Sequence, residues 1–420
     1  MDAVAGVMAV ALTAAATVTR QTPAASPGSP RRDAAAAEMS PTTVPATTAA
    51  PTTAPPSTAA STTTTTRLIE RAPDDGLRSD RRRLVRTEVI SGADLSPKSI
   101  VYVPGGRFFA QNMMYRHSIT VFGRSFDKLA TIDDKVELAA LGHPDKAGSY
   151  RGAPVEAAAT SDGRFVYVSN YAMYGPGFTN PGDDDCGPTG NDPSYLYRVD
   201  VATLRIDQAI AVGAVPKFVA LTPDDRRVLV ANWCSYDLSV VDARTAREVA
   251  RVPLGPYPRG IVVDERRNVA YVAVMGTFDI AVVDLATLAV SWFRGIGNNP
   301  RHLVLAPDGR WLYATLNASG QVVKIDPATG AVVARVATGS QPRSMAIAED
   351  GASLYVVNYG GATLSKVATD TFEVVQTIGV GDDPIGIAYD PGTRNVWVAL
   401  YGGVLVILTD SPPATRPSTG

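Results

Sequence analysis

This sequence is poor in histidine and cysteine, on which many metal and catalytic sites depend. It has three histidines and two cysteines among 420 residues, which excludes a zinc module built from Cys and His ligands. It also lacks an excess of charge of either sign, because 39 Lys and Arg stand against 41 Asp and Glu. Binding to nucleic acid or to an anionic membrane surface normally requires a basic excess, so we expect neither partner.

Long apolar runs are absent as well. The body of the chain has no stretch of the roughly 18–20 apolar residues that cross a bilayer, so we expect no membrane span in the folded domain. The 36 glycines and 31 prolines argue against a helical bundle, because both residues break helices. The composition therefore predicts a turn-rich, soluble fold.

The first 83 residues differ in composition from the rest. Ala3 to Val18 is an apolar stretch of small residues, which predicts an export signal over 1–20 or, as the alternative, a short apolar leader. Residues 21–66 consist almost entirely of Thr, Ala, Pro and Ser, and residues 67–83 are charged. We expect a disordered stalk and a solvated linker over 21–83, since neither part can bury apolar surface. This layout is typical of a secreted or cell-envelope protein.

The remaining sequence repeats with a period of 42 residues. A Gly-x-x-Pro turn recurs at that spacing, with its prolines at Pro216, Pro258, Pro300, Pro342 and Pro384. Pro97 and Pro154 continue the series once an insertion is allowed after each. A fixed period of this length is typical of the blades of a propeller.

Each unit carries the signals of four short strands separated by turns of Gly, Pro and Asp. The third strand ends in Asp and the fourth follows an Ala-Thr turn. The last unit has three strands, and Leu84 to Ile90 forms an isolated strand that would close the ring as its fourth. We therefore predict an all-β fold, a seven-bladed β-propeller of four-stranded blades over 84–410, with a disordered tail over 411–420.

Several second strands share a motif. Three of them are Phe165-Val-Tyr-Val-Ser-Asn170, Val228-Leu-Val-Ala-Asn232 and Leu354-Tyr-Val-Val-Asn358. They resemble the Tyr-Val-x-Asn signature of the YVTN-repeat β-propeller family (YncE-like), here in an exported member of actinobacterial type. The resemblance implies the fold strongly and the function weakly. Members of the family are mostly exported or surface proteins, and some resemble propeller lactonases or subunits of periplasmic dehydrogenases.

Two sets of polar residues recur in loops that open on the same face of a propeller. A basic residue follows the Pro in four units, and the second set is the Asn that ends each motif. The candidate ligand-binding residues are Lys217, Arg259, Arg301, Arg343, Asn170, Asn232 and Asn358. A ring of four cations favours an anionic ligand through charge-assisted hydrogen bonds. The alternative is that each Arg binds carbonyls of the neighbouring blade as a repeated structural device.

Glu156 and His302 break the repeat, because other units have Ser, Phe or Gly at the position two residues after Pro. With Arg259 they are candidate catalytic residues, as an acid–base pair and an oxyanion-stabilising cation. Propeller lactonases resemble this arrangement. The alternative function is therefore a lactonase-like hydrolase or isomerase acting on a small anionic substrate. We expect His117 and His143 to be exposed or core residues.

An insertion after the second strand of the second unit contains Asp183, Asp184 and Asp185. These carboxylates are candidate calcium ligands, although the spacing is not that of an EF-hand and a solvated acidic loop is the alternative. Cys186 in this insertion and Cys234 in the neighbouring unit predict a disulfide over the channel mouth, with two unconnected thiols as the alternative. Apart from calcium we expect no cofactor.

These observations predict an exported, monomeric β-propeller that acts as a binding or scaffold module rather than as an enzyme. The expected partner is a small anionic ligand, a glycan or a protein.

Overall fold

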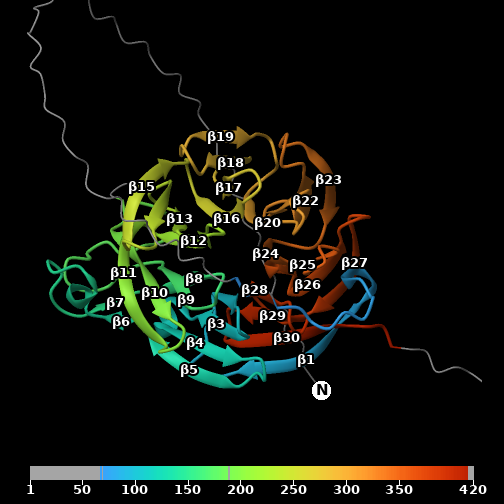
Figure 1. The fold of residues 1–420 in the computed structure, drawn as a ribbon, viewed down its shortest axis with the longest axis horizontal. Helices are drawn as coiled ribbons and strands as arrows, with labels where there is room; N and C mark the ends of the chain where they lie inside the picture. Colours follow the sequence, from blue (N-terminus) through green and yellow to red (C-terminus); the bar gives the residue numbers. More distant parts are fainter. Residues whose placement is uncertain (1–66, 69, 188–189, 415–420) are drawn as a thin grey trace, which may run out of the picture. The chain divides into compact units, whose positions relative to one another are not determined.

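The computed structural model describes residues 67–68, 70–187 and 190–414, with the side chains of 114 and 115 left out. The predicted leader and stalk, over 1–66, and residues 415–420 lie outside the described residues. The described chain forms seven four-stranded antiparallel sheets arranged as blades around a common centre (Figure 1). The prediction of an all-β, seven-bladed propeller is confirmed.

Blades 1 to 6 each use four consecutive strands. Blade 1 consists of β2 (Ser99–Val103), β3 (Arg107–Gln111), β4 (Ser118–Gly123) and β5 (Lys128–Asp133). Blade 2 consists of β8 (Pro154–Ala159), β9 (Phe165–Asn170), β10 (Pro193–Asp200) and β11 (Arg205–Ala214). Blade 3 consists of β12 (Pro216–Leu221), β13 (Arg227–Asn232), β14 (Asp237–Asp242) and β15 (Arg247–Pro253).

Blade 4 consists of β16 (Pro258–Asp264), β17 (Val269–Val274), β18 (Asp279–Asp284) and β19 (Val290–Phe293). Blade 5 consists of β20 (Pro300–Leu305), β21 (Leu312–Leu316), β22 (Gln321–Ile325) and β23 (Val332–Ala337). Blade 6 consists of β24 (Pro342–Ile347), β25 (Ser353–Asn358), β26 (Thr363–Ala368) and β27 (Glu373–Gly379). Blade 7 combines β28 (Pro384–Asp390), β29 (Asn395–Leu400) and β30 (Val404–Ser411) with β1 (Arg83–Ser91).

A few short elements lie outside the blades. They are β6 (Lys135–Val136), β7 (Tyr150–Arg151), α1 (Met113–Arg116) and the 3₁₀ turns η1 (Ser79–Arg81), η2 (Leu138–Leu141) and η3 (Tyr359–Gly361). No helix in the described part of the chain is long and apolar enough to cross a membrane.

The ring is closed by β1, which pairs antiparallel with β30 so that Leu84 lies opposite Asp410. The sequence predicted this pairing for residues 84–90. The Gln376 side chain of blade 6 accepts a hydrogen bond from the Leu84 amide at 2.8 Å and donates one to the Leu84 carbonyl at 2.9 Å. These bonds tie the first described strand to blade 6 as well as to blade 7.

The innermost strands, β2, β8, β12, β16, β20, β24 and β28, each contact the next one around the ring, including β28 with β2. The loops that lead into these strands, and the loops between the second and third strands, lie on one side, here called the loop face. The tight turns between the first and second strands and between the third and fourth strands lie on the opposite side, here called the turn face.

In blades 3 and 6, two recurrent residues of the loop face pack against each other. They are the Gly of the Gly-x-x-Pro turn and the Asn that ends the second strand. A Cβ atom on Gly213 would lie 2.6 Å from Cγ of Asn232, and one on Gly339 would lie 2.7 Å from Cγ of Asn358. Such distances are too short for a side chain, and Gly339 also has a φ of +155°. In blades 3 and 6 the Gly of the Gly-x-x-Pro turn therefore lets the loop pass directly over the Asn that ends the second strand, whereas Gly297 and Gly381 face a leucine at the same place.

The recurrent Asp of the turn face caps a turn. The Asp200 carboxylate accepts a hydrogen bond from the Thr203 amide at 2.8 Å, and Asp242 accepts the equivalent bond from Thr245 at 2.7 Å. An Asp followed by Thr three residues later is therefore a local signal for the turn between the third and fourth strands.

The core lies between adjacent blades rather than within one blade. Trp397 of blade 7 is fully buried and stacks on Phe108 of blade 1, with the ring centroids 4.0 Å apart. Phe122 and Leu405 belong to the same buried cluster. Each blade is thus a sheet that buries its faces against its neighbours.

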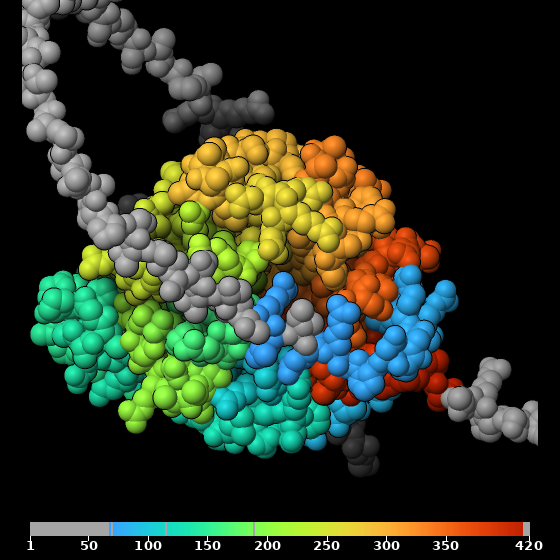
Figure 2. All heavy atoms as spheres, in the orientation of Figure 1, coloured from blue at the N-terminus to red at the C-terminus, as the bar shows by residue number. Residues whose placement is uncertain are grey.

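The linker predicted over 67–83 is not solvated throughout, and this part of the prediction was wrong. Residues in it lie over the turn face (Figure 2): Glu70 pairs with Arg124 at 2.6 Å, and Ser79 donates a hydrogen bond to Asp350 at 2.7 Å. Arg82 is 3% exposed and pairs with Asp75. The charged composition of this segment predicted that it would be solvated. Its charged side chains instead form ion pairs with oppositely charged residues of the segment and of the blades.

Candidate functional site

Five basic side chains lie at the start of inner strands on the loop face. Each occupies the position after the Pro of its loop: Lys98, Lys217, Arg259, Arg301 and Arg343. The charge of Arg259 contributes to the pKa shifts of the other four, so they lie within electrostatic range of one another. We call these five residues the cation ring. Lys98 follows Pro97 in blade 1, and the sequence analysis missed it although the same Pro–basic signal is present there.

Three side chains of the cation ring are buried, and the other two, Arg301 and Arg343, are partly buried. Lys98, Lys217 and Arg259 are 8%, 5% and 4% exposed. Buried charges are stable only when they are paired or hydrogen-bonded, so the partners of these groups determine what the site can do.

Two carboxylates neutralise part of this charge. Glu156 of blade 2 accepts a hydrogen bond from Nη2 of Arg259 at 3.3 Å and lies 3.7 Å from Nζ of Lys98. Asp184 forms an ion pair with Lys217. Within the described residues no other carboxylate forms an ion pair with the cation ring, so five cations face two anions.

The remaining donors are poorly satisfied. Arg301 meets the Met275 sulfur at 3.8 Å, and the guanidinium carbon of Arg343 lies 3.5 Å from the centroid of the Tyr359 ring. In each of four cation-ring residues one buried nitrogen has no hydrogen-bond partner among the described residues: Lys98 Nζ, Arg259 Nη1, Arg301 Nε and Arg343 Nε. Among the described residues, no side chain of the cation ring donates a hydrogen bond to a carbonyl of a neighbouring blade. The alternative prediction, that each Arg binds such carbonyls as a repeated structural device, is therefore wrong.

The pKa values of four cation-ring residues are lowered, by burial first and by neighbouring positive charge second. Burial, together with the charge of Arg259, lowers the pKa of Lys217 to about 7, although Asp184 opposes the shift. Burial and neighbouring arginines also lower the pKa of Lys98, Arg301 and Arg343. An anion placed among these groups would favour their charged forms and oppose these shifts.

A cavity of about 260 Å³ lies between the inner strands, and its walls include Glu156, Phe218 and His302. The His302 ring packs edge-on against Phe218, with the centroids 5.2 Å apart. Burial and the charges of Arg259 and Arg301 lower the pKa of His302 to about 3, so its imidazole is neutral near neutral pH. Of the three candidate catalytic residues, Glu156 and Arg259 contact each other. His302 lines the same cavity as Glu156. Within the described residues its side chain forms no hydrogen bond with Glu156 or Arg259.

The three candidate asparagines do not line the channel, and their assignment as ligand-binding residues is corrected. Asn170, Asn232 and Asn358 are all 0% exposed. The Asn170 amide donates a hydrogen bond to the Tyr195 carbonyl at 2.9 Å, and that of Asn232 donates to Asp237 at 2.7 Å. Gly152, Gly213 and Gly339 pass directly over these three asparagines, which leaves no room for a ligand, so the asparagines fasten the loops of their own blades.

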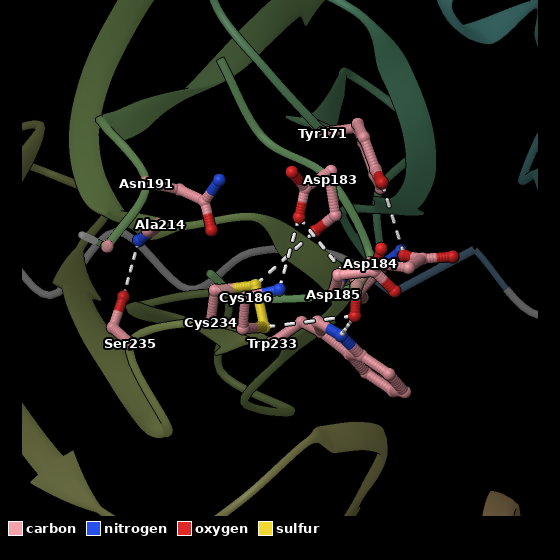
Figure 3. The surroundings of a disulfide bond; sticks show 12 residues. Tyr171, Asp183, Asp184, Asp185, Cys186, Asn191, Ala214, Trp233, Cys234 and Ser235 are labelled. Carbon is pink, nitrogen blue, oxygen red and sulfur yellow. Dashed lines mark hydrogen bonds and ion pairs between the residues drawn. A yellow bond between two sulfur atoms is a disulfide. The ribbon is translucent and has the colours of Figure 1, made fainter. Parts of the chain in front are cut away.

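The insertion of blade 2 reaches the cation ring. Asp184 lies between Tyr171 and Trp233 (Figure 3), and the Tyr171 hydroxyl donates to its carboxylate at 3.2 Å. The predicted disulfide is present, with the Cα atoms of Cys186 and Cys234 5.1 Å apart. The disulfide fastens this loop to blade 3 next to Lys217, at the place where the sequence predicted it.

The other candidate polar residues lie outside the cation ring. Asp183 accepts the amide hydrogens of Asp185 and Cys186 at 3.0 and 3.1 Å. Among the described residues no group of three or more His, Cys, Asp or Glu is placed to hold a metal ion. Calcium binding at Asp183, Asp184 and Asp185 stays a prediction.

The two remaining histidines have structural contacts. His117 Nδ1 lies 3.0 Å from the buried carboxylate of Asp134 and 2.7 Å from the Gly152 carbonyl, while His143 Nε2 lies 2.8 Å from the Ala209 carbonyl. Both are partly buried, and their ring nitrogens fasten the insertion between blades 1 and 2 to the blades beside it.

Comparison with known proteins agrees with this fold. Residues 194–333 match the family model described as a YNCE-like beta-propeller, which is consistent with a YncE-like propeller. No curated protein matches the chain. Among solved structures, a chain of Kuenenia stuttgartiensis Hydrazine Synthase is similar with a TM-score of 0.61 and 20% sequence identity, covering 77% of this chain and 98% of that chain. At this identity the likeness concerns the fold alone.

Proposed function

We propose that this protein is an exported binding module that holds a small, multiply charged anion in the cation ring of its central channel. The observation that carries the proposal is the set of buried donors without partners in Lys98, Arg259, Arg301 and Arg343. Leaving such donors unpaired costs free energy, and an anion would satisfy several of them at once.

The charge balance defines the class of ligand. Five cations, three of them buried and two partly buried, and two carboxylates leave an excess of positive charge that one monovalent anion does not neutralise. Phosphate and small di- or tricarboxylates carry the required charge and present several acceptor oxygens.

Export is supported by the disulfide between Cys186 and Cys234, since disulfides persist mainly in oxidising compartments. The apolar leader and the Thr/Pro-rich stalk of the sequence support the same location.

The alternative, a lactonase-like hydrolase or isomerase, is supported by Glu156 and His302, which line one cavity. The geometry favours binding over catalysis. Glu156 is already engaged by Arg259 and Lys98, and His302 packs against Phe218. Catalysis would require both groups to be free to exchange protons with a substrate.

The test is isothermal titration calorimetry of the full chain with inorganic phosphate and with citrate. Arg301→Gln and Arg343→Gln should each weaken binding about tenfold or more, because each removes a charge-assisted donor. Arg226→Gln is the matched control, since Arg226 is an exposed residue of the turn face and its variant should bind as the parent does. Failure of both anions to bind, or equal effects of all three substitutions, would contradict the proposal.

A further inference from the structure

Lys217 is the member of the cation ring whose carboxylate partner, Asp184, comes from a loop rather than from an inner strand. Its ammonium lies 4.2 Å from the centroid of the Tyr171 ring and 5.2 Å from that of Trp233, under the loop of blade 2. The Asp184 side chain is 67% exposed, whereas that of Lys217 is 6% exposed. The carboxylate therefore covers Lys217 from the solvent side.

Several contacts hold this aspartate in place. The Trp233 indole donates a hydrogen bond to the Asp184 backbone carbonyl at 3.0 Å, and the disulfide joins Cys186, two residues further on, to Cys234. Before it, Gly182 passes so close to Tyr171 that a Cβ atom would lie 2.4 Å from the Tyr171 carbonyl oxygen. The backbone on both sides of Asp184 is thus fixed against blades 2 and 3.

Two donors converge on the Asp184 carboxylate, the Lys217 ammonium and the Tyr171 hydroxyl. This is the donor set that a carboxylate from any source would use at this place. We infer that Lys217 and Tyr171 form a carboxylate subsite of the anion site, that Asp184 fills it as a tethered internal ligand, and that a carboxylate of a polycarboxylate ligand displaces it. The inference rests on the proposed function and names the ligand class of that site.

The tether makes Asp184 a competitor of the ligand. A group attached near its own site acts at an effective concentration in the millimolar range, so it lowers the apparent affinity for any free carboxylate of comparable strength. Removing its charge should therefore strengthen binding, which is the opposite of what loss of a ligand-binding residue would do.

The experiment measures citrate binding by calorimetry to the full, disulfide-bonded chain and to Asp184→Asn. We expect the apparent affinity to rise about threefold to tenfold, because the amide no longer pairs with Lys217. Asp185→Asn is the matched control: it removes the same charge one residue away, and within the described residues the Asp185 carboxylate forms no ion pair. This control separates displacement from the general effect of one negative charge.

A second pair of variants tests the subsite itself. Lys217→Gln introduced into Asp184→Asn should abolish the gain in citrate affinity, since the freed subsite would then lack its cation. An unchanged or weaker affinity of Asp184→Asn relative to Asp185→Asn would overturn the inference while leaving the proposed function intact. Absence of citrate and phosphate binding in the parent and in Asp184→Asn would overturn both.

Discussion

Blades 3 to 6 and the other three blades are built by different rules. Blades 3 to 6 follow the 42-residue period, and each begins with Pro and a basic residue, the last of them Arg343. Blades 7, 1 and 2 contain the closing strand β1 and two insertions, and the insertion of blade 2 is joined to blade 3 by the disulfide. We call blades 3 to 6 the regular half and blades 7, 1 and 2 the irregular half. The regular half repeats one pattern of strands and turns, whereas the irregular half adds contacts between distant parts of the chain.

The difference in regularity is also a difference in charge. The regular half contributes four members of the cation ring and none of its carboxylates, while blade 2 contributes both Glu156 and Asp184. Repetition of a cation around a closed ring accumulates like charge in the channel. The carboxylates of blade 2 neutralise part of this positive charge. The positive charge that is not neutralised can attract an anionic ligand.

The largest expected effect is the loss of the closing strand. Deleting residues 1–91 should abolish cooperative unfolding, because β28, β29 and β30 would lose their outer partner and blade 6 would lose its contact with Leu84. Deleting residues 1–66 is the control and should leave the melting temperature unchanged, since it keeps every described residue. Calorimetric melting of both variants is the measurement, and similar transitions would show that the irregular half does not need β1.

A smaller effect is expected from removing a counter-charge. Glu156→Gln should lower the free energy of unfolding by about 3 kcal/mol, because Arg259 and Lys98 would be left as buried, unpaired charges. Glu248→Gln in the regular half removes a more exposed partner, that of Arg251, and should cost less than about 1 kcal/mol. Urea unfolding measures both. Added phosphate should restore part of the Glu156→Gln loss, and equal losses in the two variants would contradict this account of blade 2.

The smallest effect concerns pH. The pKa of Lys217 is about 7 in the folded protein, so its ammonium loses its proton as the pH rises through neutrality and the cation ring loses one charge. The affinity for an anion of constant charge in this range, such as sulfate, should therefore fall about threefold to tenfold between about pH 6 and about pH 8. Lys217→Arg should flatten this dependence, because a guanidinium stays charged. His302, with a pKa of about 3, stays neutral in this window. A slope that persists in Lys217→Arg would assign the titration to another group.

The titration of Lys217 also changes the free energy of unfolding. The sign of this pH dependence is opposite to that of anion affinity. In the folded protein its pKa lies below the ordinary value of 10.5, so between about pH 7 and that value the unfolded chain holds a proton that the folded chain does not. Its contribution to the free energy of unfolding therefore increases as the pH rises through this window, while anion affinity decreases. This opposite trend distinguishes a loss of charge in the site from a general loss of structure.

Much of the site could be read from the sequence because the blades repeat. A fixed period makes equivalent positions share one environment, so the residue after each Pro was correctly placed on one face. The same reasoning failed for Asn170, Asn232 and Asn358, which are buried. A polar residue that recurs on the loop face can either bind a ligand or hold a loop of its own blade by hydrogen bonds, and the repeat does not distinguish these roles. Only the contact with Gly213 and its equivalents distinguishes the two roles.

Local sequence decided the strands, the turns and the number of blades, since these depend on interactions within one period of 42 residues. It also predicted the disulfide, because the blade positions of Cys186 and Cys234 place their loops side by side. The partners of buried charges were decided by tertiary structure alone. Glu156 meets Arg259 across 103 residues and Asp184 meets Lys217 across 33, and no local pattern encodes such pairings. Burial then set the pKa of Lys217 and left donors unpaired, because the energy of a charge depends on everything that surrounds it.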